Sequence, residues 1–150
     1  MTDPVLPTWR DRLRKAGDPL RVLVVDDDRD IALSLRDAIE DLGDAASVSF
    51  HGREAVALTL STAPDVLLLD LSLPGMSGLQ VAAALRKAGL SAALKIIALT
   101  GWGDADARRQ TAAAGFDLHL TKPVRFDILE STLDLLRSAP VRGYPLRAPC

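Results

Sequence analysis

Short apolar runs that alternate with helical stripes constrain the fold of this chain most strongly. Val22–Val25 and Val66–Leu69 contain no polar residue, as expected of strands buried on both faces of a sheet. The first run is followed by Ile31, Leu35 and Ile39, which recur at helical spacing. Strands that alternate with helices favour a parallel sheet covered by helices on both faces. We therefore expect an α/β protein.

The same alternation predicts five repeats of a strand followed by a helix. Strands are expected at 22–25, 48–50, 66–69, 95–99 and 117–121. Helices are expected at 31–42, 53–61, 79–85, 104–114 and 126–136. Asp28 is expected to cap the first helix at its N-terminus, and Gly43 fits a residue that ends it. Periodicity alone does not give the order of the strands.

The chain has 150 residues, 48% of them hydrophobic, which fits one domain with short extensions. Residues 1–20 contain three prolines and are interpreted as a leader or linker, with a short amphipathic helix over Trp9–Lys15 as the alternative. The domain is expected over 21–138. Residues 139–150 are expected to form an irregular tail.

Charge and hydropathy exclude several classes of partner. The net charge of −2 and the isoelectric point of about 5.6 give no general attraction to nucleic acid or anionic lipid. No apolar run approaches the roughly 18 residues of a membrane span, and residues 1–15 lack the apolar stretch of a secretory signal, so none is expected. The one cysteine, Cys150, excludes an internal disulfide. We expect a cytoplasmic protein that binds neither nucleic acid directly nor membranes.

Polar side chains stand where four of the predicted strands end. Asp26 and Asp27 follow the first strand, Asp70 the third, Thr100 the fourth and Lys122 the fifth. Open parallel sheets place their ligand sites at this edge, so these side chains are expected to share one pocket. Three carboxylates this close repel one another by several kcal/mol per pair at an effective dielectric of about 20. Hard oxygen donors of this kind suit Mg²⁺.

The residue types in this pocket suit phosphoryl transfer. One oxygen of Asp70 is expected on the metal and the other is left as a nucleophile, so that attack on phosphorus gives an acyl phosphate. The three phosphoryl oxygens need separate partners. The metal, the Lys122 ammonium and the Thr100 hydroxyl could each supply one.

Four sequence segments together resemble the receiver domain of bacterial two-component response regulators. They are VLVVDDD, PDVLLLDLSLPGMSGL, IIALTG and HLTKP, and the resemblance covers roughly Arg21 to Arg137. It implies a flavodoxin-like doubly wound (βα)₅ sheet with strand order 2-1-3-4-5. It also implies a phosphorelay protein that takes its phosphoryl group from a histidine kinase or a histidine phosphotransfer protein. Its only catalysis would be self-catalysed phosphotransfer and autodephosphorylation.

The resemblance also assigns roles to individual residues. Asp70 matches the phosphoacceptor, and Asp26 and Asp27 match the acidic pair that binds Mg²⁺. The Ser72 backbone carbonyl falls where the family supplies a further metal ligand. Lys122 matches the family's essential ammonium.

A second group of positions matches the family's switch. Thr100 matches the switch hydroxyl, and the bond from Lys122 to Pro123 would be cis. His119 stands where the family often has Tyr or Phe. With this histidine, the segment HLTKP resembles receivers attached to hybrid kinases, or stand-alone receivers of similar type. Trp102 follows Thr100 closely, either as a gate to the site or as a partly buried loop residue.

Two other functions fit parts of the sequence. An aspartyl-nucleophile phosphatase would usually carry an acid two residues after Asp70, where this chain has Ser72. A receiver-like scaffold that works without phosphate would not need all five key residues. The leading hypothesis is a phosphoacceptor whose output is altered binding to a downstream protein or to a second copy of itself.

Overall fold

The computed structural model describes residues 16–89, 93–101 and 105–138. The predictions made for residues 1–15, Trp102 and residues 139–150 lie outside this part of the chain. The strands are β1 (Arg21–Val25), β2 (Ala45–Ser49), β3 (Val66–Asp70), β4 (Lys95–Thr100) and β5 (Leu118–Thr121). The helices are α1 (Arg29–Asp41), α2 (Gly52–Thr62), α3 (Gly78–Lys87), α4 (Ala105–Ala114) and α5 (Phe126–Ser138).

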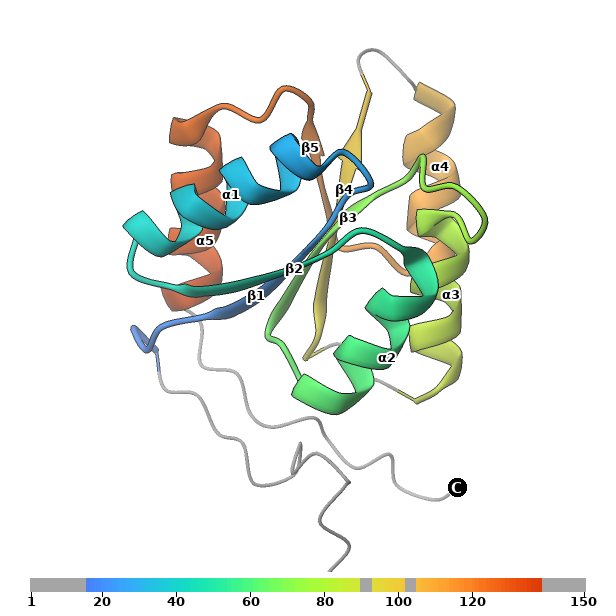
Figure 1. The fold of residues 1–150 in the computed structure, drawn as a ribbon, viewed down its shortest axis with the longest axis horizontal. Helices are drawn as coiled ribbons and strands as arrows, with labels where there is room; N and C mark the ends of the chain where they lie inside the picture. The colour runs from blue at the N-terminus through green and yellow to red at the C-terminus, as the bar shows by residue number, and fades with distance from the viewer. Residues whose placement is uncertain (1–15, 90–92, 102–104, 139–150) are drawn as a thin grey trace, which may run out of the picture.

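The five strands form one parallel sheet in the order β2-β1-β3-β4-β5. Helices α1 and α5 cover one face, and α2, α3 and α4 cover the other (Figure 1). This is the flavodoxin-like arrangement expected from the sequence, so that prediction is confirmed. All five strands point the same way, so their carboxyl ends meet at one edge of the sheet.

Alternation along the central strands divides the core into two layers. Val24 and Leu68 pack on the side of α1 and α5, together with Ile39 and Leu129. The neighbouring positions, such as Leu67, pack on the side of α2 and α3. Successive side chains of a strand point to opposite faces, so a strand buried on both faces must be apolar throughout. This is why the four-residue apolar runs identify β1 and β3.

The helix boundaries follow local signals in the sequence. The Asp28 side chain accepts hydrogen bonds from the backbone N–H groups of Asp30 and Ile31, which confirms it as the N-cap of α1. After α1 the chain passes through Gly43, whose φ of +95° favours glycine. At the start of α3, Ser77 and Gln80 form a reciprocal capping box.

Strand β2 differs from its prediction. It was expected near 48–50, but it runs over Ala45–Ser49, and Phe50 lies beyond its end. Backbone pairing with β1, from Arg21 opposite Ala45 onward, sets its extent. Val48 is the one large apolar residue of this strand, and hydropathy therefore predicted only its later half.

None of the helices in the described ranges is long and apolar enough to cross a membrane.

Candidate functional site

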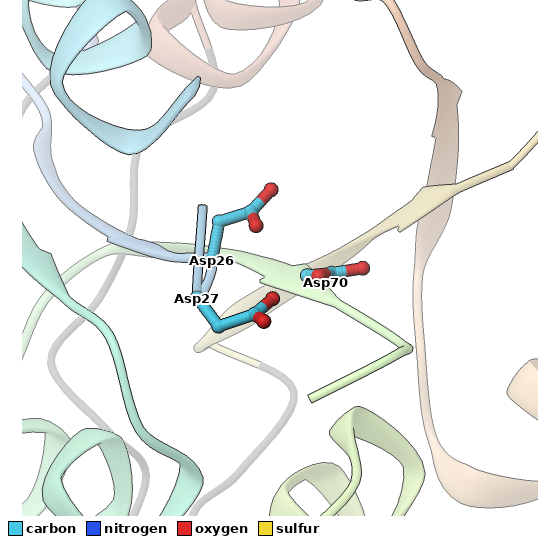
Figure 2. A group of neighbouring side chains, drawn as sticks. All are labelled: Asp26, Asp27 and Asp70. Carbon is cyan, nitrogen blue, oxygen red and sulfur yellow. The ribbon is translucent and has the colours of Figure 1, made fainter. Parts of the chain in front are cut away.

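Three carboxylates converge at the carboxyl edge of the sheet. Asp26 and Asp27 directly follow β1, and Asp70 is the last residue of β3, the neighbouring strand. Figure 2 shows Asp26 and Asp27 projecting toward the side on which Asp70 lies. One carboxylate oxygen from each lies within 4.8 Å of the others. Asp26 is fully buried, Asp70 is buried and Asp27 is exposed, so the cluster opens to solvent on one side.

Lys122 joins the two buried carboxylates. Its Nζ lies 2.9 Å from Asp26 Oδ2 and 3.2 Å from Asp70 Oδ1. The residue follows β5, and its backbone N–H donates to the Thr100 carbonyl at 2.8 Å, which ties it to the end of β4. The bond from Lys122 to Pro123 is cis, as the resemblance implied. The site therefore draws together the ends of β1, β3, β4 and β5.

The loop after β3 fixes the orientation of Asp70. The Ser72 N–H donates to Asp70 Oδ1 at 3.1 Å, and Lys122 Nζ contacts the same oxygen. Asp70 Oδ2 is then left for other chemistry. The prediction that the Ser72 carbonyl binds a metal stays a prediction.

Burial and neighbouring charges shift the ionisation of the site. Burial raises the pKa of Asp70 above its ordinary value of 3.8, and the Asp26 charge raises it further. The Ser72 N–H and Lys122 offset part of this rise. Burial would lower the pKa of Lys122, but hydrogen bonds and charges from Asp26 and Asp70 outweigh it and raise that pKa. The ammonium therefore stays charged, while Asp70 lies in an environment that disfavours its negative charge.

The donor set fits a divalent cation. Three carboxylates face one ammonium, which leaves an excess of negative charge within 4.8 Å. Mg²⁺ takes oxygen ligands and keeps several waters, and the exposed side of the cluster has room for water. Asp26, Asp27 and Asp70 are the residues that could hold such an ion here.

The two predicted switch residues lie on neighbouring strands. Thr100 ends β4 with only 8% of its surface exposed. His119 lies in β5 opposite Ala98, and its Nε2 is hydrogen-bonded to Thr111 Oγ1 in α4. Burial lowers the pKa of His119 below 6.5, and the Arg108 charge lowers it further. His119 is thus in contact with a helix rather than simply on the surface.

Sequence reasoning missed two residues that shape the site. A Cβ at Gly78 would lie 2.3 Å from the Asp70 carbonyl oxygen, so only glycine lets α3 begin so close to the end of β3. The sequence signal for this close approach was Gly78 itself, the second glycine of the GMSG segment and the first residue of α3. The second residue is Thr111. In the sequence it is one of several polar residues in an alanine-rich helix, and nothing there sets it apart.

Comparisons with known proteins agree with this geometry. A family model described as the response regulator receiver domain matches residues 22–134. The response regulator MprA of Mycolicibacterium vanbaalenii is 37% identical over 127 residues, which cover 85% of this chain and 53% of that protein. The chain thus spans about half the length of this relative. A 14.6 kDa protein from Leptolyngbya boryana is 35% identical, with 85% of this chain and 92% of that protein covered.

Solved structures give the same result. The receiver domain of Francisella response regulator 1452 is 30% identical, with a TM-score of 0.72 over 79% of this chain and 96% of that one. The chemotaxis protein CheY4 of Vibrio cholerae is 27% identical, with a TM-score of 0.74 over 79% of this chain and 99% of that one. With the family model, the relatives and the fold in agreement, the chain belongs to the response regulator receiver-domain family.

Proposed function

We propose that this protein is a phosphoacceptor that takes a phosphoryl group onto Asp70 from a phosphohistidine. The observation that carries the proposal is the contact of one ammonium, Lys122, with both Asp26 and Asp70, at 2.9 and 3.2 Å. A buried nucleophile, a second carboxylate and a fixed positive charge at one sheet edge suit phosphoryl transfer, in which positioning and charge neutralisation dominate catalysis.

Each residue of the site has a separate role in the phosphoryl transfer. Asp70 Oδ2 attacks phosphorus, the P–N bond of the phosphohistidine breaks, and the imidazole leaves with the bonding electron pair. Asp26, Asp27, Asp70 Oδ1 and the Ser72 carbonyl would hold Mg²⁺, which supplies positive charge beside the phosphoryl oxygens. The Lys122 ammonium would hold another phosphoryl oxygen.

The Thr100 hydroxyl would take the third phosphoryl oxygen. Thr100 ends β4, and its carbonyl already binds the Lys122 N–H. Movement of Thr100 toward a phosphoryl group would displace the neighbouring backbone of β4 and β5. The resulting change would alter binding to a downstream protein or to a second copy of this chain, in the cytoplasm.

A groove beside the site suits the phosphodonor protein. It has a volume of about 270 Å³ and includes Ile31 and Leu35 of α1 and the segment Lys122–Val124. Because Lys122 lines both the groove and the site, a protein seated here would have its histidine close to Asp70. We propose the histidine-bearing helix of a kinase or a phosphotransfer protein as its occupant.

Phosphorylation by a small phosphodonor tests the chemistry without a partner. The protein is incubated with phosphoramidate, which has a P–N bond like phosphohistidine, with Mg²⁺ or with a chelator, and its intact mass is measured. We expect one added phosphoryl group that requires Mg²⁺ and is absent in Asp70→Asn. Asp65→Asn is the matched control, because Asp65 is also buried but lies at the opposite end of β3.

Other outcomes separate the alternatives. An adduct that persists in Asp70→Asn would refute the assignment of the phosphoacceptor. No adduct together with no Mg²⁺ binding by calorimetry would favour a phosphate-independent scaffold. Continuous release of inorganic phosphate from many phosphate esters would favour the aspartyl phosphatase.

A further inference from the structure

Helix α4 is attached to the rest of the protein in part by polar contacts. Of its described side chains, those of residues 108–114, Thr111 is the one that is buried, with 0% exposure. Its C-terminal end is bound by Arg86 of α3, whose Nε and Nη2 donate to the Gly115 carbonyl at 3.1 and 2.9 Å. Ala114 of α4 is partly buried against the core, whereas the other helices place fully buried Leu, Ile, Val or Ala side chains in it. Hydrogen bonds therefore help to fix the position of α4, together with the apolar contact of Ala114.

One of these hydrogen bonds connects α4 to the edge of the sheet. Leu118 and Leu120 of β5 face the core on the side of α1 and α5, so His119, between them, faces the side of α4. There its Nε2 meets Thr111 Oγ1. β5 is the last strand of the sheet, and a side chain at this position can reach the helix that covers it.

The partners of Thr111 define how the bond works. Thr111 Oγ1 also lies 3.0 Å from the Arg108 carbonyl. A hydroxyl has one hydrogen and can accept as well as donate. When it donates to the Arg108 carbonyl, it accepts from His119 Nε2–H, so both contacts are satisfied together. A Phe or Tyr ring at position 119 has no nitrogen to make this bond.

The histidine is also close to the proposed phosphorylation site along the backbone. His119 precedes Lys122 by three residues, and β5 pairs with β4 in register up to Thr121 opposite Thr100. A displacement at the end of β4 would reach β5 through this pairing. His119 thus lies between the site and α4.

We propose that the hydrogen bond between His119 Nε2 and Thr111 Oγ1 is a polar clasp that holds α4 against β5, and that phosphorylation of Asp70 opens it. The first half concerns the unphosphorylated protein alone. The second half rests on the proposed function. Thr111 and His119 are positioning residues in this proposal, since neither touches the phosphoryl group.

Hydrogen exchange of the α4 amides tests the clasp in the unphosphorylated protein. Thr111→Val removes the hydroxyl and keeps the shape, and His119→Phe removes the nitrogen and keeps a ring. Loss of one net hydrogen bond should speed exchange of residues 108–114 by about 2- to 10-fold. Thr111→Ser keeps the hydroxyl and should stay close to the wild type.

A matched control variant shows whether replacing any buried threonine has the same effect on exchange. Thr59 is also 0% exposed, and its Oγ1 donates within its own helix to the Ala55 carbonyl at 2.7 Å. Thr59→Val should leave exchange in α4 unchanged. Equal α4 exchange in wild type and Thr111→Val would overturn the proposal. So would the same acceleration in Thr59→Val.

A second measurement tests the link to phosphorylation. Phosphorylated wild type should exchange faster in α4, and phosphorylation of Thr111→Val should add little. If intact mass verifies phosphorylation but α4 exchange stays unchanged, the opening step is refuted while the clasp stands. If no phosphoryl group is added at all, the proposed function fails, and the first measurement still decides the clasp.

Discussion

Replacement of Asp70 by Asn should make the protein more stable when no divalent cation is present. One oxygen each of Asp26, Asp27 and Asp70 lies within 4.8 Å of the others, and Lys122 Nζ lies 3.2 Å from Asp70 Oδ1. Asn has almost the same shape as Asp and keeps an oxygen that can accept from the Ser72 N–H. The substitution therefore changes mainly the charge.

The magnitude follows from these distances. At an effective dielectric of about 20, two like charges 4.8 Å apart repel by about 3.5 kcal/mol, and an ion pair at 3.2 Å gains about 5 kcal/mol. Asp70 faces two carboxylates and one ammonium, so repulsion exceeds attraction by about 2 kcal/mol. Because Asp27 is exposed and its charge is screened, we expect a gain of about 1–2 kcal/mol for the variant.

Urea unfolding measures this difference. In the presence of a chelator, the free energy of unfolding of Asp70→Asn should exceed that of the wild type by about 1–2 kcal/mol. With Mg²⁺ at ten times its dissociation constant, the wild type should gain about 1.4 kcal/mol. Mg²⁺ should stabilise the variant less, since it has lost a carboxylate ligand. The difference in free energy of unfolding between the two proteins should therefore become smaller or change sign.

Asp44→Asn is a control that should change the free energy of unfolding in the opposite direction. Asp44 is also buried, but its Oδ1 accepts from Arg137 Nε at 3.0 Å and from the Leu20 N–H at 2.9 Å. Removing its charge should destabilise the protein. A lower stability of Asp70→Asn than of the wild type in chelator, or equal stabilisation of both proteins by Mg²⁺, would refute this charge balance.

Three further predictions concern other residues. Gly78→Ala should lower the free energy of unfolding by about 1–3 kcal/mol in urea, because its Cβ would come 2.3 Å from a backbone oxygen. Gly101→Ala should change little, because a Cβ there would meet no atom of the described residues within 4 Å. Thr100→Ala should keep phosphorylation by intact mass but lose most of the exchange response of α4; a full response would contradict the switch role. In an NMR titration, His119 should have a pKa below 6.5, owing to burial and Arg108, and a value at or above that of the urea-unfolded chain would refute it. Since the native state then binds fewer protons than the unfolded one, His119 should cost stability as the pH falls below about 6.5 through its native pKa.

The fold was predictable because its signals are local and redundant. A strand buried on both faces must be apolar, so Val22–Val25 and Val66–Leu69 identified the centre of the sheet. Helix periodicity and caps such as Asp28 gave the helices between them. β2 was predicted less well, because its extent is set by hydrogen bonds to β1 rather than by its own side chains.

The convergence of the site was predictable from the same alternation. Parallel strands bring their carboxyl ends to one edge, so residues after four different strands had to meet. The contacts within the site were not predictable in the same way. Nothing in the segment HLTKP says that Lys122 would contact Asp26 as closely as Asp70. Nor does the helix sequence show that Thr111 would meet His119, since that contact depends on how α4 lies over β5.

The charge balance of the site couples its two proposed ligands. Asp26, Asp27 and Asp70 outnumber the single ammonium of Lys122, so a bound cation lowers the repulsion that an added phosphoryl group would meet. Linkage is reciprocal: if a cation stabilises the phosphorylated form, phosphorylation must raise cation affinity by the same factor. Because Lys122 already neutralises part of the cluster, Lys122→Met should strengthen Mg²⁺ binding in the unphosphorylated protein while it weakens retention of the phosphoryl group. Calorimetry and intact mass would measure the two changes separately, and weaker Mg²⁺ binding by a folded Lys122→Met protein would contradict this charge balance.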